Sequence, residues 1–232
     1  MPADYERVLV LLRHHTGHDF SLYKPSTLQR RIERRRSLHQ LDDIGRYAAY
    51  LQDNPAELAQ LFKELLIGVT SFFRDPGAWL HLRDVVIPEL LEQRPGCTQI
   101  RAWIAGCSSG EEAYSLAIVF REALERMSPR RGLSLLTFAT DLDPDAIARA
   151  RQGLYPSSIS ADVSPERLRR FFTLEDDGGY RIGKEIRELV IFAEQNVTQD
   201  PPFTRIDLLV CRNLLIYMTT ELQRRLLSLF HY

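Results

Sequence analysis

The chain has 232 residues, 44% of them hydrophobic and 26% charged, which is the composition of a folded globular protein and excludes a disordered chain. Its 30 Lys and Arg residues nearly balance its 31 Asp and Glu residues, so a general attraction to polyanions is excluded and any basic site must be local. The three cysteines, Cys97, Cys107 and Cys211, form no CxxC pair and are odd in number, which predicts a reducing, cytoplasmic location. The N-terminus carries acidic residues and only a short apolar run, so neither export nor membrane insertion is expected.

Apolar residues recur with a helical period up to about residue 74. Start signals for helices stand at Pro25-Ser26, at Asp42 or Asp43, and at Asn54-Pro55. We therefore expect an all-helical N-terminal domain over residues 1–74. The predicted helices cover residues 5–14, 25–38, about 43–51 and 55–66.

Beyond Arg74 the pattern changes to alternating strands and helices, which predicts a parallel sheet because parallel strands need crossover connections. We expect a doubly wound, Rossmann-like α/β domain over residues 75–232, with ligands at the carboxyl ends of its strands. A tight turn at residues 176–179 indicates a small antiparallel insertion. The predicted strands are 100–105, 135–140, 190–193 and 206–210, and the predicted helices are 111–127, 144–152 and 219–230.

A glycine-bounded turn, residues 106–110, lies between the first predicted strand and its helix. It matches neither the GxGxxG nor the GK[ST] pattern, and Glu111 and Glu112 stand where a phosphate would bind. A zwitterionic ligand with a cationic centre, such as S-adenosylmethionine, suits such carboxylates better. Asp141, with Asp143 as its rival, is placed to accept hydrogen bonds from ribose hydroxyls. Alternatively, the two glutamates only favour the helix N-terminus, and Asp143 only caps the next helix.

Four blocks resemble, in order, the chemotaxis receptor methyltransferases of the CheR type. Residues 105–115 are similar to the family signature AGCSTGEEPYS, and residues 69–74 resemble its N-x-T-x-F-F-R block. Residues 139–143 resemble the second-strand block, and residues 196–197 with 211–217 resemble the last two. The resemblance implies methylation of receptor glutamates with S-adenosylmethionine, which gives glutamate methyl esters and S-adenosylhomocysteine.

The resemblance also implies roles for single residues. Thr70 and Arg74 would reach from the helical domain to the cofactor, and Arg212 and Tyr217 would lie nearest the methyl group as the catalytic residues. The implied cofactor-binding residues are Thr70, Arg74, Gly106, Glu111, Glu112, Asp141, Asn196, Val197, Arg212 and Asn213.

Two departures from the family pattern stand out. Gly68 occupies a position where the family often has Asn, which removes one side-chain contact to the cofactor. The sequence ends at residues 230–232, where relatives continue into a Gly-rich turn and the closing strands of the sheet. We therefore expect a fragment that lacks those strands and exposes a sheet edge.

Basic residues are concentrated between Arg13 and Arg36, where seven of them against two acidic residues leave a local net charge of +5. In the predicted helix 25–38, Leu28 and Ile32 define the buried stripe, and the opposite face, which carries arginines, suits an acidic partner. The arginines opposite the stripe are Arg30 and Arg34, with Arg31 at its shoulder. The resemblance implies that they dock the acidic cytoplasmic domain of methyl-accepting chemotaxis receptors; the alternative is a solvated face. Nucleic acid is not expected as a partner, because no aromatic residues interleave with these arginines.

The sequence therefore predicts a protein-glutamate O-methyltransferase. A glutamate with a pKa of about 4.3 is already ionised at neutral pH, so Arg212 and Tyr217 would orient the substrate rather than remove a proton. One alternative is a non-catalytic or truncated cofactor- or receptor-binding module of the same fold. Another is a nucleic-acid methyltransferase, but the nearest motif, residues 199–203, precedes the last strand. No metal site is expected, because the histidines lack a ligand spacing.

Overall fold

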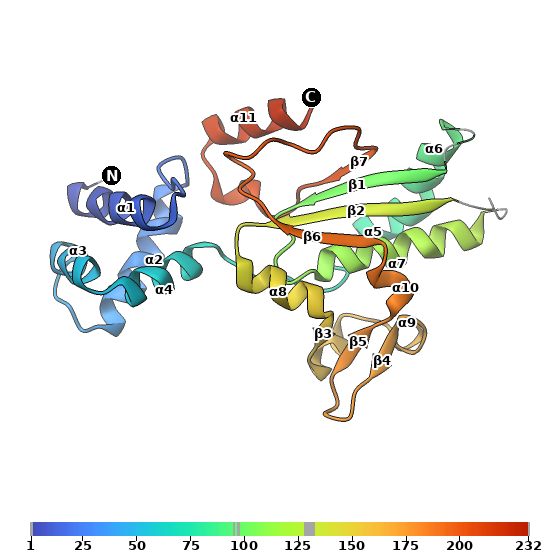
Figure 1. The fold of residues 1–232 in the computed structure, drawn as a ribbon, viewed down its shortest axis with the longest axis horizontal. Coiled ribbons are helices and arrows are strands. Elements are labelled where there is room, and N and C mark those ends of the chain that lie inside the picture. The colour runs from blue at the N-terminus through green and yellow to red at the C-terminus, as the bar shows by residue number, and fades with distance from the viewer. Residues whose placement is uncertain (1, 95, 97, 128–132, 232) are drawn as a thin grey trace. The chain divides into compact units, whose positions relative to one another are not determined.

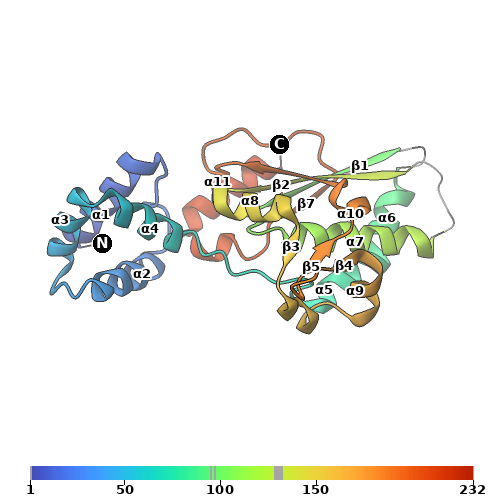
Figure 2. The same cartoon turned by 60° about the horizontal axis from the view of Figure 1, so that its bottom comes forward.

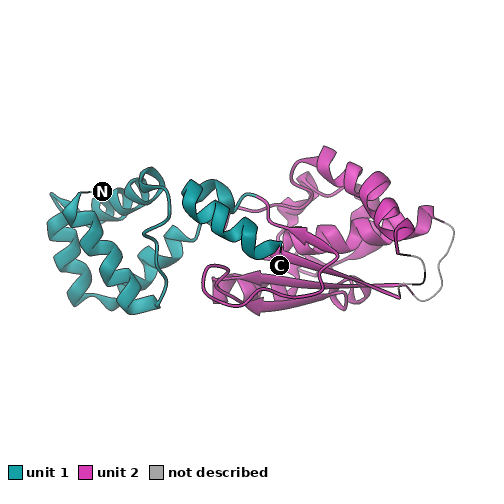
Figure 3. Ribbon diagram, turned by 90° about the horizontal axis from the view of Figure 1, so that it is seen from above, with its two compact units in different colours: residues 1–67, 213–232 teal, residues 68–212 magenta. Residues whose placement is uncertain are grey.

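The computed structural model describes residues 2–94, 96, 98–127 and 133–231, so Cys97 lies outside the described residues. The contacts divide the chain into two compact units, residues 1–67 with 213–232 and residues 68–212 (Figure 3). The sequence pattern predicts the domain boundary after Arg74, whereas the contacts place this boundary after Ile67. Thr70 and Arg74 thus belong to the second unit and not to the helical one.

The first unit is helical (Figure 1). Its core is formed by the apolar stripes of four helices, with Leu12, Ile32 and Leu61 fully buried. Asp43, not Asp42, caps the third helix, because its side chain accepts a hydrogen bond from the backbone N–H of Arg46 at 2.7 Å. The helices are α1 (Ala3–Thr16), α2 (Pro25–Leu38), α3 (Ile44–Asp53), α4 (Pro55–Leu65) and α11 (Thr220–Phe230).

The end of the chain belongs to the first unit because it pairs with the start of α2. The N–H of Lys24 donates to the carbonyl of Tyr217 at 2.8 Å, and the N–H of Thr219 donates to the carbonyl of Leu22 at 2.9 Å. An antiparallel bridge joins Tyr23 to Met218. Backbone pairing therefore fixes residues 217–219 against residues 22–24.

The second unit contains a four-stranded parallel sheet in the order β6-β2-β1-β7. Its register places Ala105 beside Thr140, and Asp141 beside Glu194. The carboxyl ends of all four strands therefore meet at one edge, where the predicted cofactor residues follow them. The strands are β1 (Gln99–Ala105), β2 (Ser134–Asp141), β6 (Val190–Glu194) and β7 (Leu208–Val210).

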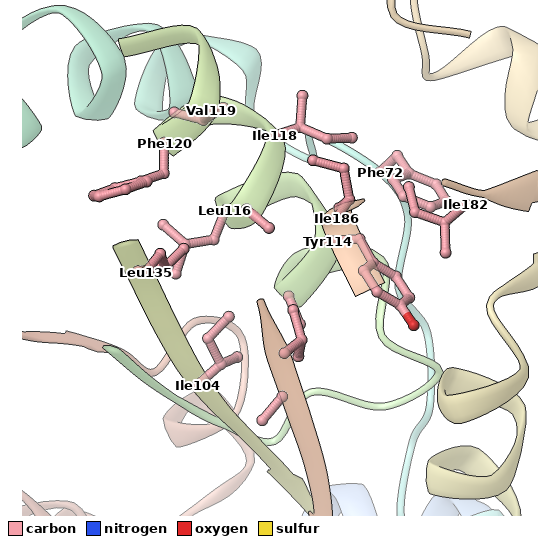
Figure 4. Packing of buried hydrophobic residues seen from close by; sticks show 14 of the residues in the cluster. Phe72, Ile104, Tyr114, Leu116, Ile118, Val119, Phe120, Leu135, Ile182 and Ile186 are labelled. Atoms are coloured by element: carbon pink, nitrogen blue, oxygen red, sulfur yellow. The ribbon is translucent and has the colours of Figure 1, made fainter. Parts of the chain in front are cut away.

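Helices cover the sheet, and Figures 1 and 2 show α7 with α5 and α6 on one side of it. Leu116 of α7 packs with Ile104 and Leu135 of the strands in the main core (Figure 4). The predicted parallel α/β fold is thus confirmed, together with the two helices that follow β1 and β2. The described helical segments are α5 (Pro76–His81), a π-helical turn (Leu82–Val86), α6 (Ile87–Glu92), α7 (Glu111–Arg126), α8 (Pro144–Gln152), α9 (Pro165–Phe171) and α10 (Lys184–Arg187).

The predicted antiparallel insertion is also confirmed. Strands β3 (Leu154–Tyr155), β5 (Tyr180–Ile182) and β4 (Phe172–Leu174) form a small sheet. Its tight turn is closed by a hydrogen bond of 2.8 Å from the N–H of Glu175 to the carbonyl of Gly179. In the described part of the chain, no helix combines the length and apolarity that a membrane crossing requires.

Candidate cofactor site

The loop between β1 and α7 takes backbone conformations that favour glycine. Gly106 and Gly110 have φ values of 77° and 93°, and Ser108 between them has a φ of 48°. A Cβ atom on Gly110 would lie 2.9 Å from Cβ of Ala150 and 3.0 Å from Cζ of Phe192. Helix α7 can therefore begin at this position only with glycine, which brings the loop down onto α8 and β6.

Asp141, at the end of β2, binds this loop through its carboxylate. Its two carboxylate oxygens accept hydrogen bonds from the N–H of Ser108 at 2.7 Å and the N–H of Asp143 at 3.0 Å. Burial raises the pKa of Asp141, and these two hydrogen bonds offset the rise only in part. The side chain of Asp143 instead caps α8, where it accepts from the N–H of Asp145 at 2.9 Å.

The adjacent carboxylates of Glu111 and Glu112 have different partners. Glu111 accepts a hydrogen bond from the hydroxyl of Ser109 at 2.8 Å, and Glu112 forms an ion pair with Arg212 at 3.0 Å. Burial raises the pKa of both carboxyl groups, and the arginine opposes the rise at Glu112. Within the described residues, neither Glu111 nor Asp141 lies within ion-pair distance of a lysine or arginine.

The segment before α5 lies against the loop. A Cβ on Gly68 would be 3.2 Å from Oγ of Ser108, and that hydroxyl donates to the carbonyl of Gly68 at 3.4 Å. Thr70 is half-buried, and Arg74 donates to the carbonyl of Val69 at 3.3 Å. Gly68 therefore allows the segment to approach the loop closely.

Ser115 of α7 is hydrogen-bonded to the segment that precedes α5. Its hydroxyl accepts a hydrogen bond from the N–H of Phe73 at 3.0 Å and donates to the carbonyl of Glu111 at 2.7 Å. The glutamate that opens α7 and the segment at Arg74 are thus linked through one side chain.

Arg212, which follows β7, is held by several groups. Its Nη1 contacts the carboxylate of Glu112 at 3.0 Å, and its Nη2 contacts the carboxylate of Asp75 at 2.6 Å. Nη2 also donates to the carbonyl of Arg74 at 2.9 Å, and the guanidinium carbon lies 5.4 Å from the ring centroid of Trp79.

Asn196 and Val197 follow β6 at the carboxyl edge of the sheet. The N–H of Gln195 donates to the carbonyl of Asp141 at 3.0 Å, so the turn starts beside the end of β2. The side-chain oxygen of Asn196 accepts from the N–H of Thr198 at 3.1 Å and from its hydroxyl at 2.7 Å. Val197 is half-buried.

Two predicted site residues, Asn213 and Tyr217, belong to the first unit. Asn213 has a φ of 56° and follows Arg212 directly, while Tyr217 lies half-buried beside the start of α2. The structure therefore groups the remaining predicted cofactor residues in the second unit without these two.

The predicted docking arginines differ in exposure. Arg30 is exposed and forms no ion pair with the described residues, and Arg34 is 72% exposed with Glu64 at 3.5 Å. Arg31 is half-buried and donates to the backbone carbonyl of Glu64 at 2.8 Å, and burial lowers its pKa. The remaining arginines of α2 that are paired within the unit are Arg35 with Glu57 and Arg36 with Glu33.

Sequence reasoning missed several residues that shape the site. Trp79 is buried, and its Nε1 donates to the carbonyl of Arg74 at 2.8 Å. The turn at Asp75 could have been predicted from the sequence, because Asp before Pro marks a turn. Ser115 stands one helical turn after Glu111, a spacing at which its hydroxyl can bond back to the backbone.

The donor set suits a cofactor that carries both a cation and hydroxyl groups. Glu111 and Asp141 are under-neutralised carboxylates at the carboxyl edge of a parallel sheet, and they flank a loop with close backbone approach. Within the described ranges, no cluster of three or more His, Cys, Asp or Glu side chains is arranged to hold a metal ion. These features define a Rossmann-like α/β domain that binds an organic cofactor at the ends of its strands.

Comparison with known families agrees with this class. The model described as "CheR methyltransferase, SAM binding domain" matches residues 68–232, and the one described as "CheR methyltransferase, all-alpha domain" matches residues 3–66. The chain therefore belongs to the CheR methyltransferase family, and its cofactor is S-adenosylmethionine.

Individual relatives are similar in sequence over most of this chain. A protein of Rhodobacter capsulatus named "Uncharacterized 104.1 kDa protein in hypE 3'region" is 46% identical over 92% of this chain, which spans 22% of that protein's length. The chemotaxis protein methyltransferase of Listeria innocua is 34% identical, with 95% of this chain and 81% of that protein covered. The chemotaxis protein methyltransferase of Salmonella typhimurium is 31% identical, with 98% and 78% covered.

Proposed function

We propose that this methyltransferase transfers a methyl group to glutamate side chains of methyl-accepting chemotaxis receptors and forms glutamate methyl esters and S-adenosylhomocysteine. The observation that carries the chemistry is the pair of half-buried carboxylates, Glu111 and Asp141, which have no lysine or arginine within ion-pair distance among the described residues; Arg149 acts on Glu111 only from farther away. The receptor substrate is supported by relatives named chemotaxis protein methyltransferases. Such a substrate entails a cytoplasmic location.

Glu111 is proposed to bind the ammonium of the cofactor, because Glu112 is already paired with Arg212. Asp141 is proposed to accept hydrogen bonds from the ribose, since a carboxylate offers about four lone-pair positions and its backbone contacts use two. Asp143 is the weaker candidate because it caps α8.

Other proposed contacts rest on position and on the sequence motif. Thr70 and Arg74 belong to the segment whose Gly68 carbonyl accepts a hydrogen bond from Ser108 of the loop, and Gly106 is part of that loop. Asn196 and Val197 are proposed to line the adenine, as their place after β6 supports. For Asn213 at the catalytic mouth, the support is the resemblance of residues 211–217 to the family block.

The bound cofactor supplies an activated methyl group on a sulfonium centre. The protein then has to bring an ionised glutamate carboxylate into line with that methyl and keep water out. A general base is unnecessary, because a glutamate with a pKa of about 4.3 is ionised at neutral pH. Tyr217 is proposed to orient the incoming carboxylate through its hydroxyl.

Receptor docking is proposed for the outward face of α2. Arg30 and Arg34 are exposed and suit an acidic helix, while the half-buried Arg31 supports them from the edge of that face.

The test is transfer of radiolabelled methyl from S-adenosylmethionine to a purified receptor cytoplasmic fragment. Release of labelled methanol in mild base identifies a carboxyl ester. Label on nucleic acid would point instead to the nucleic-acid methyltransferase. Cofactor binding without transfer to any receptor fragment would identify a non-catalytic module and overturn the proposal.

A further inference from the structure

The turn that carries Arg74 has an unfavourable backbone on both sides. Phe73 has a φ of 48° and Asp75 has a φ of 58°, in the left-handed region that non-glycine residues rarely occupy. Asp75 also precedes Pro76, and a residue before proline favours extended conformations. Such a turn persists only when its surroundings fix it from several directions.

Arg212 and Trp79 together provide that fixation. The carbonyl of Arg74 accepts hydrogen bonds from Nη2 of Arg212 at 2.9 Å and from Nε1 of Trp79 at 2.8 Å. The carboxylate of Asp75 accepts a second contact from Nη2 of Arg212, at 2.6 Å. The Trp79 ring lies beneath the guanidinium and is itself buried.

The same guanidinium reaches the start of α7. Its Nη1 lies 3.0 Å from Glu112, whose side chain is only 13% exposed. One arginine therefore connects the end of β7, the Arg74 turn and the helix that follows the glycine loop. The planar, fork-shaped guanidinium can make these contacts at once, whereas the single ammonium of lysine cannot.

We propose that Arg212 is a positioning residue, which holds the Arg74 turn and the Glu112 carboxylate in the geometry that the cofactor requires, rather than a group that contacts the transferred methyl. The proposal rests on the proposed role of Arg74 in cofactor binding and replaces the catalytic role that the sequence motif implies for Arg212.

Loss of Arg212 has a signature in pH. The charged groups that act on Glu112 are Arg212 and Arg74, which lower its pKa, and Asp75, which raises it. The Glu112 side chain in turn acts on the nearby thiols of Cys107 and Cys211. Burial already raises the pKa of Glu112, so without Arg212 the carboxyl takes up a proton closer to neutral pH. Cofactor affinity in such a variant should therefore fall on acidification and recover as the pH rises.

The experiment measures S-adenosylhomocysteine affinity by calorimetry between pH 6 and 8.5 for wild type, Arg212→Met, Arg212→Lys and Arg212→Met/Glu112→Gln. We expect Arg212→Met to bind at least tenfold more weakly at pH 7, with a steeper pH dependence than wild type. The added Glu112→Gln change should remove the extra pH dependence. Arg212→Lys should restore the wild-type pH profile, because it keeps the charge, but not the full affinity.

The matched control is Arg83→Met. Arg83 is 14% exposed and pairs with Asp84 at 2.7 Å, but its partners belong neither to the glycine loop nor to the Arg74 turn. This control should bind like wild type. With Trp103 replaced by Phe in each protein, so that the emission comes from Trp79 alone, tryptophan emission of the unliganded protein should change in Arg212→Met and not in Arg83→Met.

Wild-type affinity and an unchanged pH profile in Arg212→Met, with loss confined to the rate of methyl transfer, would overturn the positioning role and restore a catalytic one. A weaker affinity with the same pH profile as wild type would overturn the link to Glu112. Receptor methylation is not needed for these readouts, so a failure of the proposed receptor substrate stays distinguishable.

Discussion

Each unit contains a carboxylate cluster, buried in the first unit and half-buried in the second, and the two clusters are neutralised to different degrees. In the first unit, the carboxylate of Glu57 binds the guanidinium of Arg35 and accepts a hydrogen bond from the hydroxyl of Tyr47 at 2.7 Å. Nε2 of His39 lies 2.9 Å from the same carboxylate. Burial raises the pKa of Glu57, but these partners outweigh burial and hold the pKa below its usual value. In the second unit, Glu111 and Asp141 accept hydrogen bonds only from neutral donors among the described residues, Arg149 acts on Glu111 from beyond ion-pair distance, and the pKa values of both carboxyl groups are raised.

The difference separates a structural cluster from the cluster that is proposed to bind the cofactor. A buried carboxylate that has an arginine partner and further donors is complete, whereas one with neutral donors alone retains a demand for positive charge. In the function proposed above, the ammonium of the cofactor would meet that demand at Glu111. Glu112 lies beside it in the sequence but resembles Glu57, because Arg212 already neutralises it. Neutralisation by the protein therefore distinguishes the two adjacent glutamates better than position does.

The largest effect is expected at the complete cluster. Glu57→Gln leaves Arg35 with only the more distant carboxylate of Glu64 at 3.8 Å, and breaking a buried pair from one side costs about 3–5 kcal/mol of unfolding free energy. Urea denaturation, with hydrogen exchange to localise the loss to α2 and α4, measures it. The control is Glu33→Gln, whose side chain is 40% exposed and pairs with Arg36, and it should cost under about 1 kcal/mol. Equal losses in the two variants would contradict the comparison.

His18 is expected to make the first unit sensitive to acid. Burial lowers the pKa of His18 to about 4, which outweighs the opposite effect of Asp19. A histidine whose folded-state pKa is depressed binds fewer protons than in the unfolded chain, so stability is full above pH about 6.5 and falls toward pH 4 by about 3 kcal/mol.

The measurement is unfolding free energy from pH 7 to pH 4. His18→Gln should flatten this dependence, and His14→Gln, at an exposed position of α1, should leave it unchanged. An equally steep loss of stability in His18→Gln would mean that other groups carry the acid sensitivity.

At the incomplete cluster the signs reverse. Glu111→Gln should weaken S-adenosylhomocysteine binding by about tenfold to a hundredfold, since a charge-assisted hydrogen bond contributes about 1.5–3 kcal/mol. Stability of the unliganded protein should stay the same or rise, because a half-buried and under-neutralised charge is removed. Glu125→Gln, at the exposed end of α7, is the control.

The pH dependence follows from the raised pKa of Glu111. Ionisation of this carboxyl costs folding stability as the pH rises, whereas binding of an ammonium requires the ionised form. Wild-type affinity should therefore fall on acidification and that of Glu111→Gln should not. A variant that loses stability but keeps its affinity would place Glu111 with Glu57 among the structural carboxylates.

Local sequence signals predicted most of the long elements. Helix α2 begins at Pro25, and α8 runs from Pro144 to its Gly153 cap, as the sequence indicates. The short strand β3 and helix α10 were not predicted, because two to four residues carry too little periodicity. The predicted last strand also starts too early, since Asp207 is not paired as a strand residue and its carboxylate instead binds the N–H of Arg101 at 2.8 Å.

The candidate site was predictable in its motifs but not in its pairings. The glycine loop and Asp141 follow from strand, turn and helix patterns, which are local. The partners of Arg212, Glu112 and Asp75, lie 100 and 137 positions away in the sequence, so no local sequence pattern predicts these pairings. The same reason explains why Arg31 reads as a surface arginine from helical spacing although it bonds to the carbonyl of Glu64 on α4.

The smallest stability effect is expected at the exposed arginines of α2, and it sharpens the comparison because these charges are solvated rather than buried. Arg30→Glu/Arg34→Glu should change the unfolding free energy by under about 0.5 kcal/mol per site and leave cofactor affinity intact. Methylation of an acidic receptor fragment should fall steeply, because attraction in the encounter complex becomes repulsion. Raising salt from about 50 mM to several hundred millimolar should slow the wild-type reaction, as the screening length shortens from about 14 Å to about 5 Å.

The matched control is Arg224→Glu/Arg225→Glu, which makes the same change in charge at exposed positions of α11. If the two double variants lose methylation equally, net charge and not the face of α2 governs the encounter. If neither variant nor salt affects receptor methylation, α2 does not dock the receptor. Arg30 and Arg34 then only form a solvated face of the helix. A selective loss in the α2 variant, with melting temperature and cofactor affinity unchanged, assigns the docking surface to these two arginines.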